Sequence, residues 1–212
     1  MGRTSDAKER LMTATLELIW ASSYGSVTID DICLKAAVKK GSFYYFFESK
    51  SDLAVAAVER LWEEDWKPRL DAIFSPTAEP LRRLSGYLEH LIQMQIKYKH
   101  QTGHVLGCPL CSLGSEVGTR DDSLGVKVRE LMDRKRRYIE SAIRDAVAEG
   151  SIEGCDPVQK ARSLCALVEG TLVQGRIMND TDSIRRLPAM AMDHLRAKSG
   201  LAAVSADANF QI

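Results

Sequence analysis

The sequence predicts an all-α protein made of two helical units. Apolar residues recur at helical spacing along almost the whole chain, whereas alternating runs of Val, Ile or Thr bounded by hairpin dipeptides are nearly absent. The 212 residues are 45% hydrophobic and 27% charged, which is the composition of an ordinary globular protein. This composition excludes fibrous and intrinsically disordered classes.

The charge balance and the cysteine content further limit the classes of protein to which the chain can belong. The chain carries 29 basic and 29 acidic side chains, so a polycationic arm is excluded and any nucleic-acid binding must come from a local basic face. Five dispersed cysteines fit reduced thiols rather than a secreted disulfide framework. There is no apolar run of about 18 residues and no apolar signal at the charged N-terminus, so we expect a cytoplasmic, nucleoid-associated protein without membrane contact.

Three helices are expected in the first fifty residues. The first helix runs from about Ser5 to Ser22 and ends before Tyr24-Gly25. Thr28 caps a second short helix that stops near 35–36, because its side chain can accept a hydrogen bond from a free N–H group. A third helix covers about 39–46 after a turn of about three residues, and this pair forms a helix-turn-helix.

The remaining elements form the larger unit. A long helix starts at Ser51, and Pro68 is expected to kink or end it because proline lacks an N–H group. The segment 75–80 reads as a loop. Further helices are expected at 81–99, briefly within 107–118, and at 121–149, 157–178 and 182–198. The sequence therefore predicts domains at 1–50 and 51–200 and a disordered tail at 201–212.

The segment 28–53 closely resembles the DNA-binding signature of TetR-family transcriptional regulators. The resemblance rests on the order Gly41, Ser42, Phe43, Tyr44, Phe47, Ser49-Lys50 and Asp52-Leu53. Two positions depart from the family pattern, which often has glycine at Ala37 and histidine at Phe46. We expect the turn to accommodate alanine without a left-handed backbone, which would cost about 1–2 kcal/mol.

The third helix is the expected reader of DNA. A short helix fits a major groove about 12 Å wide, and its N-terminal residues meet the base edges. Lys39, Lys40 and Ser42 are therefore expected to read bases. Tyr45 is expected to contact a base edge, a thymine methyl group or a phosphate. The resemblance assigns Thr28, Tyr44 and Lys50 to phosphates, which position the protein without reading sequence. The full expected set is Thr28, Lys39, Lys40, Gly41, Ser42, Tyr44, Tyr45 and Lys50.

A homodimer is expected because one domain carries little excess charge. Through Lys50 there are seven basic and six acidic residues, a net charge of +1, so two copies must share a palindromic double-stranded operator. The resemblance implies a four-helix bundle built from the last two helices of each copy, although a monomeric core could use the same faces. The expected interface comprises Leu164, Leu167, Val168, Thr171, Leu172, Gly175, Ile184, Leu187, Ala191 and Leu195.

The larger unit is expected, from the resemblance, to hold a pocket for an unidentified small-molecule effector, without a cofactor. Large side chains with polar tips are the candidates, with plain core packing as the alternative. They are Trp62, Trp66, Tyr87, Met94, Tyr98, Leu110, Met132 and Tyr138.

Two further motifs have competing interpretations. Cys108 and Cys111 form a C-x-x-C pair that suits a thiol switch, while His100 and His104 would add metal ligands on a continuous helix. Glycines and Pro109 break such a helix, so no metal is expected, and inert buried thiols are the simplest interpretation. The basic run 134–137 is expected to be a solvated helix face rather than a second nucleic-acid patch.

These features favour a DNA-binding regulator, expected to be a repressor that an effector releases from DNA. A thiol- or metal-responsive regulator using Cys108 and Cys111 is the alternative. A helical adaptor would leave the basic and aromatic residues of the third helix unexplained. An enzyme is not expected, because the chain lacks a Walker A loop, a dinucleotide fingerprint and a grouped nucleophile, base and orienting residue.

Overall fold

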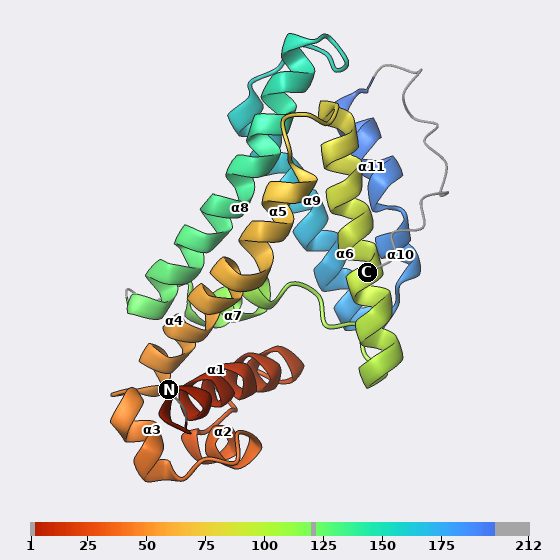
Figure 1. Ribbon diagram of the computed structural model, residues 1–212. Coiled ribbons are helices and arrows are strands. Elements are labelled where there is room, and N and C mark those ends of the chain that lie inside the picture. Colours follow the sequence, from red (N-terminus) through yellow and green to blue (C-terminus); the bar gives the residue numbers. More distant parts are fainter. Residues whose placement is uncertain (1–2, 120–121, 198–212) are drawn as a thin grey trace.

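The computed structural model describes residues 3–119 and 122–197, and within them the predicted all-α fold is confirmed (Figure 1). A single isolated antiparallel bridge between Ile152 and Ala197 is the exception among the described residues. The helices are α1 (Arg3–Ala21), α2 (Ile29–Lys35), α3 (Lys40–Phe46), α4 (Lys50–Leu61), a π-helix η1 (Trp62–Trp66), α5 (Lys67–Ile73), α6 (Pro80–Thr102), α7 (Pro109–Val117), α8 (Ser123–Ala148), α9 (Pro157–Met178), α10 (Asp182–Arg185) and α11 (Leu187–Leu195). The predicted tail 201–212 lies outside the described residues.

Helices α1, α2 and α3 form a small unit at one end of the molecule (Figure 1). They enclose a core in which Leu11, Ile32, Phe43 and Leu53 are fully buried. The predicted cap of α2 is present, since the Thr28 side chain accepts from the Asp31 amide at 3.1 Å. The Asp31 carboxylate in turn accepts from the Thr28 amide at 2.9 Å, which completes a capping box.

Helix α4 belongs to both cores. Its residues Leu53 and Ala57 pack into the small unit, whereas Ala54 and Val58 pack into the large one. The proposed boundary at 50–51 therefore falls in the first turn of a helix that joins the two units. A rigid connection of this kind lets a shift in one unit move the other.

The expected break at Pro68 takes the form of a π-helical segment one turn earlier. The Lys67 amide donates to the Trp62 carbonyl, five residues back, and the chain then continues as α5 with Pro68 in its first turn. Proline cannot donate to the carbonyl four residues before it, and the wider π turn accommodates this loss. The α-helical hydrogen-bond pattern is thus interrupted at η1, but the chain stays helical from α4 through α5.

The larger unit packs α6, α8 and α9 around a continuous core, with α5, α7, α10 and α11 completing it. The last predicted helix, 182–198, is divided: α10 ends at Arg185 and α11 begins at Leu187. Pro188 explains the division, because it lacks the N–H that a continuous helix would use and is tolerated in a first turn. None of the described helices is long and apolar enough to cross a membrane.

Candidate DNA interface and effector cavity

The turn between α2 and α3 is held in one conformation. Ala37 has φ +52°, so this position does require a left-handed backbone, and the expectation that the turn would avoid it is wrong. Val38 donates to the Cys33 carbonyl at 2.9 Å, and the Arg10 guanidinium donates to the Ala36 carbonyl at 3.1 Å. These bonds from the turn and from α1 stabilise the strained residue and fix the angle between α2 and α3.

The predicted reading face of α3 lies on the surface. Tyr44 is 55% exposed and Tyr45 is 75% exposed, whereas Phe43 and Phe47 beside them are buried. Lys39, Lys40 and Gly41 are also exposed at the start of α3, and Ser42 is half-buried. A Cβ added at Gly41 would meet no atom within 4 Å, so this face leaves room for a close partner.

Lys40 and Asp30 form an ion pair at 2.8 Å across the two helices of the motif. The hydrogen bond to Asp30 and its negative charge raise the pKa of Lys40. Both side chains are more than half exposed, so the pair contributes little to stability and can open when a stronger acceptor approaches.

Two residues assigned to phosphates by resemblance have structural roles as well. The Lys50 ammonium donates to the carbonyls of Tyr24 and Val27, each at 2.8 Å, and lies 4.3 Å from the centre of the Tyr24 ring. Thr28 is the cap described above. The Lys50 contacts tie the start of α4 to the chain between α1 and α2.

A further surface residue of the motif, Leu34, was not among the predicted DNA contacts. Leu34 is 83% exposed on α2, next to the turn that leads into α3. An apolar side chain this exposed suits contact with a partner such as a thymine methyl group. The sequence does not predict this exposure, because a leucine in an amphipathic helix is normally buried in the core.

A cavity lies in the larger unit between η1, α5, α6, α8 and the chain before α7. It offers ≈ 50 Å³ to the centres of water-sized spheres, several times the space that one water molecule needs. Of the predicted ligand residues, Trp66, Tyr87 and Met94 line it. Polar side chains also reach it, namely Arg69, His90, Gln95 and Lys135.

The other predicted ligand residues lie elsewhere. Trp62 and Tyr138 are neighbours in a separate aromatic cluster with Phe74, and Leu110 is buried in the core. Tyr98 packs edge-on against Trp20 at 4.4 Å between ring centres. Met132 borders a second, more open hollow of ≈ 300 Å³ together with Cys165 and Glu169.

A charged cluster that the sequence did not reveal separates the cavity from this hollow. Lys135 of α8 is buried, with 6% of its surface exposed, and pairs with Glu169 of α9. The Cys111 thiol donates to Glu169 at 2.7 Å, and Cys108 lies 3.9 Å from the Lys135 ammonium. His100 and His104 are exposed and lie outside this group, because α6 ends at Thr102 and the chain turns at Gly103.

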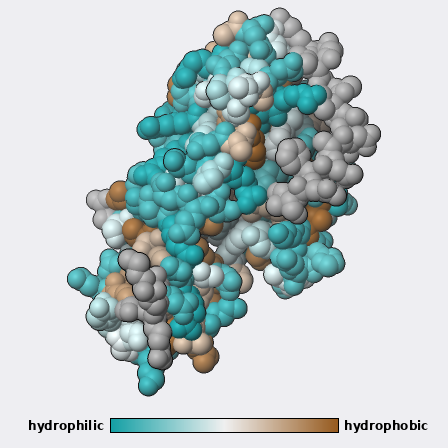
Figure 2. All heavy atoms as spheres, in the orientation of Figure 1, coloured by the Kyte–Doolittle hydropathy of each residue, from teal (hydrophilic) through white to brown (hydrophobic). Residues whose placement is uncertain are grey.

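The basic run 134–137 is ion-paired within the chain, so the expectation of a simple solvated face is corrected. Lys135 is buried, Arg136 pairs with Glu140 at 2.8 Å and Arg137 with Asp133 at 3.1 Å. The neighbouring surface of α8 is mostly hydrophilic (Figure 2). With its charges matched by acidic partners, this run does not form a second nucleic-acid patch.

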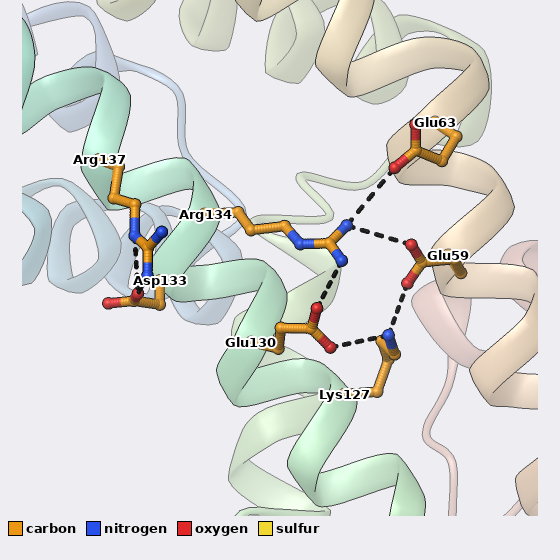
Figure 3. Close-up of polar contacts among 7 residues, drawn as sticks. All are labelled: Glu59, Glu63, Lys127, Glu130, Asp133, Arg134 and Arg137. Carbon is orange, nitrogen blue, oxygen red and sulfur yellow. Dashed lines mark hydrogen bonds and ion pairs between the residues drawn. The ribbon is translucent and has the colours of Figure 1, made fainter.

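Arg134 belongs to a network that joins α8 to α4 and η1 (Figure 3). It contacts Glu59 at 3.1 Å and Glu63 at 3.5 Å, while Lys127 contacts Glu59 at 2.8 Å and Glu130 at 2.7 Å. The two helices are therefore held by charges on their partly exposed sides as well as by the core between them.

The predicted dimer residues are corrected by their burial. All but Leu167, which is partly buried, are buried against neighbouring helices of the same chain. Gly175 does allow a close approach, but to Ile184 of the same chain, whose Cδ1 atom would lie 2.5 Å from an added Cβ. The periodic apolar face thus packs into the core of the single chain.

Comparison with known proteins agrees with this architecture. Residues 11–57 match the family described as bacterial regulatory proteins, tetR family, and residues 80–191 match the tetracyclin repressor-like C-terminal domain. The chain is 27% identical to the transcriptional regulator AcuR of Cereibacter sphaeroides, over 81% of this chain and 77% of that one. It is 25% identical to the HTH-type transcriptional repressor NemR of Escherichia coli, over 81% of this chain and 85% of that one.

The fold is also similar to that of a solved structure. The regulatory protein TetR from Rhodobacter sphaeroides superposes with a TM-score of 0.77 at 26% identity, covering 89% of this chain and 98% of that one. The chain belongs to the TetR family. It is a helix-turn-helix transcriptional regulator with a DNA-binding domain and a C-terminal helical domain, and not an enzyme.

Proposed function

We propose that the protein is a homodimeric repressor that binds a palindromic operator and leaves it when a small effector occupies the cavity of the larger unit. The observation that carries this proposal is the exposed face of α3, where Lys39, Lys40, Tyr44 and Tyr45 gather on a rigid core. Repression is supported by the likeness to NemR, which is described as a repressor. A dimer would insert one α3 into the major groove of each half-site, about 34–36 Å apart.

A different face of α9 supports the dimer. Ala166, Gly170, Val173 and Ile177 follow one another at helical spacing, and all four are exposed. Met190 of α11 adds a further exposed apolar side chain. A Cβ added at Gly170 would meet nothing within 4 Å, so a second helix can approach closely there. Exposed apolar side chains grouped with small residues are typical of a surface that another chain covers.

The cavity favours a compact, mainly apolar effector with a polar group. Its walls are mostly apolar, and the polar side chains that reach it include Arg69, which pairs with Asp65, and Lys135, which pairs with Glu169. Trp66, the last residue of η1, is part of the wall. An effector that fits best when this wall moves would therefore shift α4 and change the separation of the two α3 helices.

The experiment is selection of bound duplexes from a random library by the full-length protein. We expect a two-fold symmetric sequence, bound by a dimer, with affinity that falls steeply as salt rises because bound phosphates release counterions. The double variant Lys39→Ala/Tyr44→Ala should keep its fold but bind every duplex too weakly for any sequence to be enriched. Enrichment of the same sequence by this variant, or binding by a stable monomer, would overturn the proposal.

A further inference from the structure

The buried cluster of Cys108, Cys111, Lys135 and Glu169 is not explained by DNA binding or by a passive cavity wall. Cys108 directly precedes α7, without a capping hydrogen bond from its side chain, and Cys111 lies one turn further on, while Lys135 comes from α8 and Glu169 from α9. The two sulfur atoms and a Glu169 carboxylate oxygen all lie within 4.8 Å of one another. Three helices therefore bring two thiols, a carboxylate and an ammonium group together.

The charges in this cluster make the two thiols unequal. The hydrogen bond with Cys111 lowers the pKa of the Cys108 thiol despite its burial, and the nearby Lys135 charge acts in the same direction. The same hydrogen bond and burial raise the pKa of Cys111. Cys108 is thus the more acidic of the two thiols, and the Cys111 thiol donates to Glu169.

A small solute can reach Cys108 through the cavity. Cys108 lines the cavity beside Tyr87 and Met94, whereas Cys111 lies behind it, against Glu169. Cys165 is also close to Glu169 but borders the second hollow, and burial raises its pKa to about 11. The cavity wall therefore includes Cys108, and the Cys111 sulfur lies within 4.8 Å of the Cys108 sulfur.

We propose that Cys108 and Cys111 form a reversible intrachain disulfide when a small hydroperoxide enters the cavity, and that this oxidation lowers operator affinity. This inference rests on the proposed function, because it adds oxidation by a hydroperoxide as a second signal that lowers the operator affinity of the same regulator. Residues three apart at a helix start lie within the Cα separation of about 7 Å that a disulfide allows.

The chemistry proceeds in two balanced steps. The Cys108 thiolate attacks the terminal peroxide oxygen, so an S–O bond forms, the O–O bond breaks, and the departing alkoxide takes a proton from solvent. Glu169 then accepts the Cys111 proton, and the Cys111 thiolate attacks the sulfenic sulfur of Cys108. The S–S bond forms as hydroxide leaves and takes the proton from Glu169. The thiol pair loses two electrons, and the peroxide is reduced to an alcohol and water.

Helix α7 links this cluster to the DNA-binding unit. Its Glu116 accepts hydrogen bonds from the amides of Tyr24 at 2.9 Å and Gly25 at 2.7 Å, directly after α1. Just before α7, the Leu106 carbonyl accepts from the Trp20 indole of α1 at 3.0 Å. A disulfide that rearranges the first turn of α7 would therefore alter contacts that position α1.

Mass spectrometry of the full-length protein tests the chemistry apart from DNA binding. After tert-butyl hydroperoxide, we expect loss of two hydrogens per chain, a peptide linking Cys108 to Cys111, and full reversal by dithiothreitol. Cys111→Ser should accumulate a sulfenic acid at Cys108 that dimedone traps. Glu169→Gln should slow disulfide formation by about tenfold or more. Cys165→Ser is the matched control and should behave as the unaltered protein.

Operator binding then tests the regulatory step. Oxidation should weaken operator binding by about fivefold or more, and the Cys108→Ser/Cys111→Ser protein should not respond. Thiols that remain alkylatable after peroxide, a disulfide with unchanged operator affinity, or stoichiometric zinc binding that protects both thiols would each overturn this inference. If the reduced protein binds no duplex, the proposed function fails, while the mass measurement still decides the thiol chemistry.

Discussion

Ala37 is an alanine at a position whose backbone conformation favours glycine. Its left-handed backbone, with φ +52°, disfavours any side chain, yet the turn needs this conformation to aim α3. We predict that Ala37→Gly raises the free energy of unfolding by about 0.5–1 kcal/mol, the relief of strain minus the added entropy of the unfolded glycine. Urea unfolding measures the change. Ala37→Val should destabilise the protein, and equal stability of all three proteins would contradict the strained turn.

Lys50 allows a structural role to be separated from a phosphate contact. Its ammonium holds the carbonyls of Tyr24 and Val27, so Lys50→Met should lower the free energy of unfolding by about 1–3 kcal/mol. Tyr44→Ala removes an exposed side chain and should leave stability within about 0.5 kcal/mol while weakening all duplexes alike. Thermal unfolding and DNA titration distinguish the two variants. Unchanged stability of Lys50→Met would show that its carbonyl contacts contribute nothing.

At the scale of elements, the network in Figure 3 fixes α4 and η1 against α8. Arg134 bridges Glu59, Glu63 and Glu130, and its guanidinium also lies 5.8 Å from the centre of the Trp62 ring. Because these groups are partly exposed, we predict that Arg134→Met costs only about 0.5–1 kcal/mol of stability. The variant should nevertheless change how strongly an effector lowers operator affinity. An unchanged response to the effector would contradict a role for this contact in communication.

The exposed face of α9 makes a prediction about assembly. Ile177→Glu should produce a folded monomer, because a charge would be buried without a partner in the dimer. Val126→Glu is the matched control, since Val126 is an equally apolar residue on α8 that is 50% exposed. Sedimentation at micromolar concentration measures both. A dimeric Ile177→Glu protein, or a monomeric control, would show that the interface lies elsewhere.

The same elements show which features a sequence can predict. The cap at Thr28 and the starts of α8 and α9 depend on neighbouring residues, so local patterns located them to within about two residues. The outward face of α9 could not be singled out from the sequence, because α9 carries apolar residues on its inward and outward sides alike. Lys135 and Glu169 are 34 positions apart, and nothing in either segment shows that the fold pairs them. Their partnership follows from how α7, α8 and α9 pack.

At the scale of the whole molecule, two routes connect the larger unit to the DNA-binding unit. Helix α4 contributes apolar residues to both cores, and the cavity wall reaches it through Trp66. The second route runs from α7 through Glu116 to the chain after α1. An effector and an oxidant would thus act on different elements that converge on the same pair of reading helices.

If α3 reads base edges in the major groove, the base preference of the protein must depend on the side chains of α3. The measurement compares the affinity of the unaltered protein and of Lys39→Ala for the selected operator and for every single-base change within one half-site. We predict that Lys39→Ala relaxes discrimination by about 1–3 kcal/mol at one position per half-site and leaves the other positions unchanged. An identical preference profile in both proteins, or a uniform loss at every position, would contradict the claim.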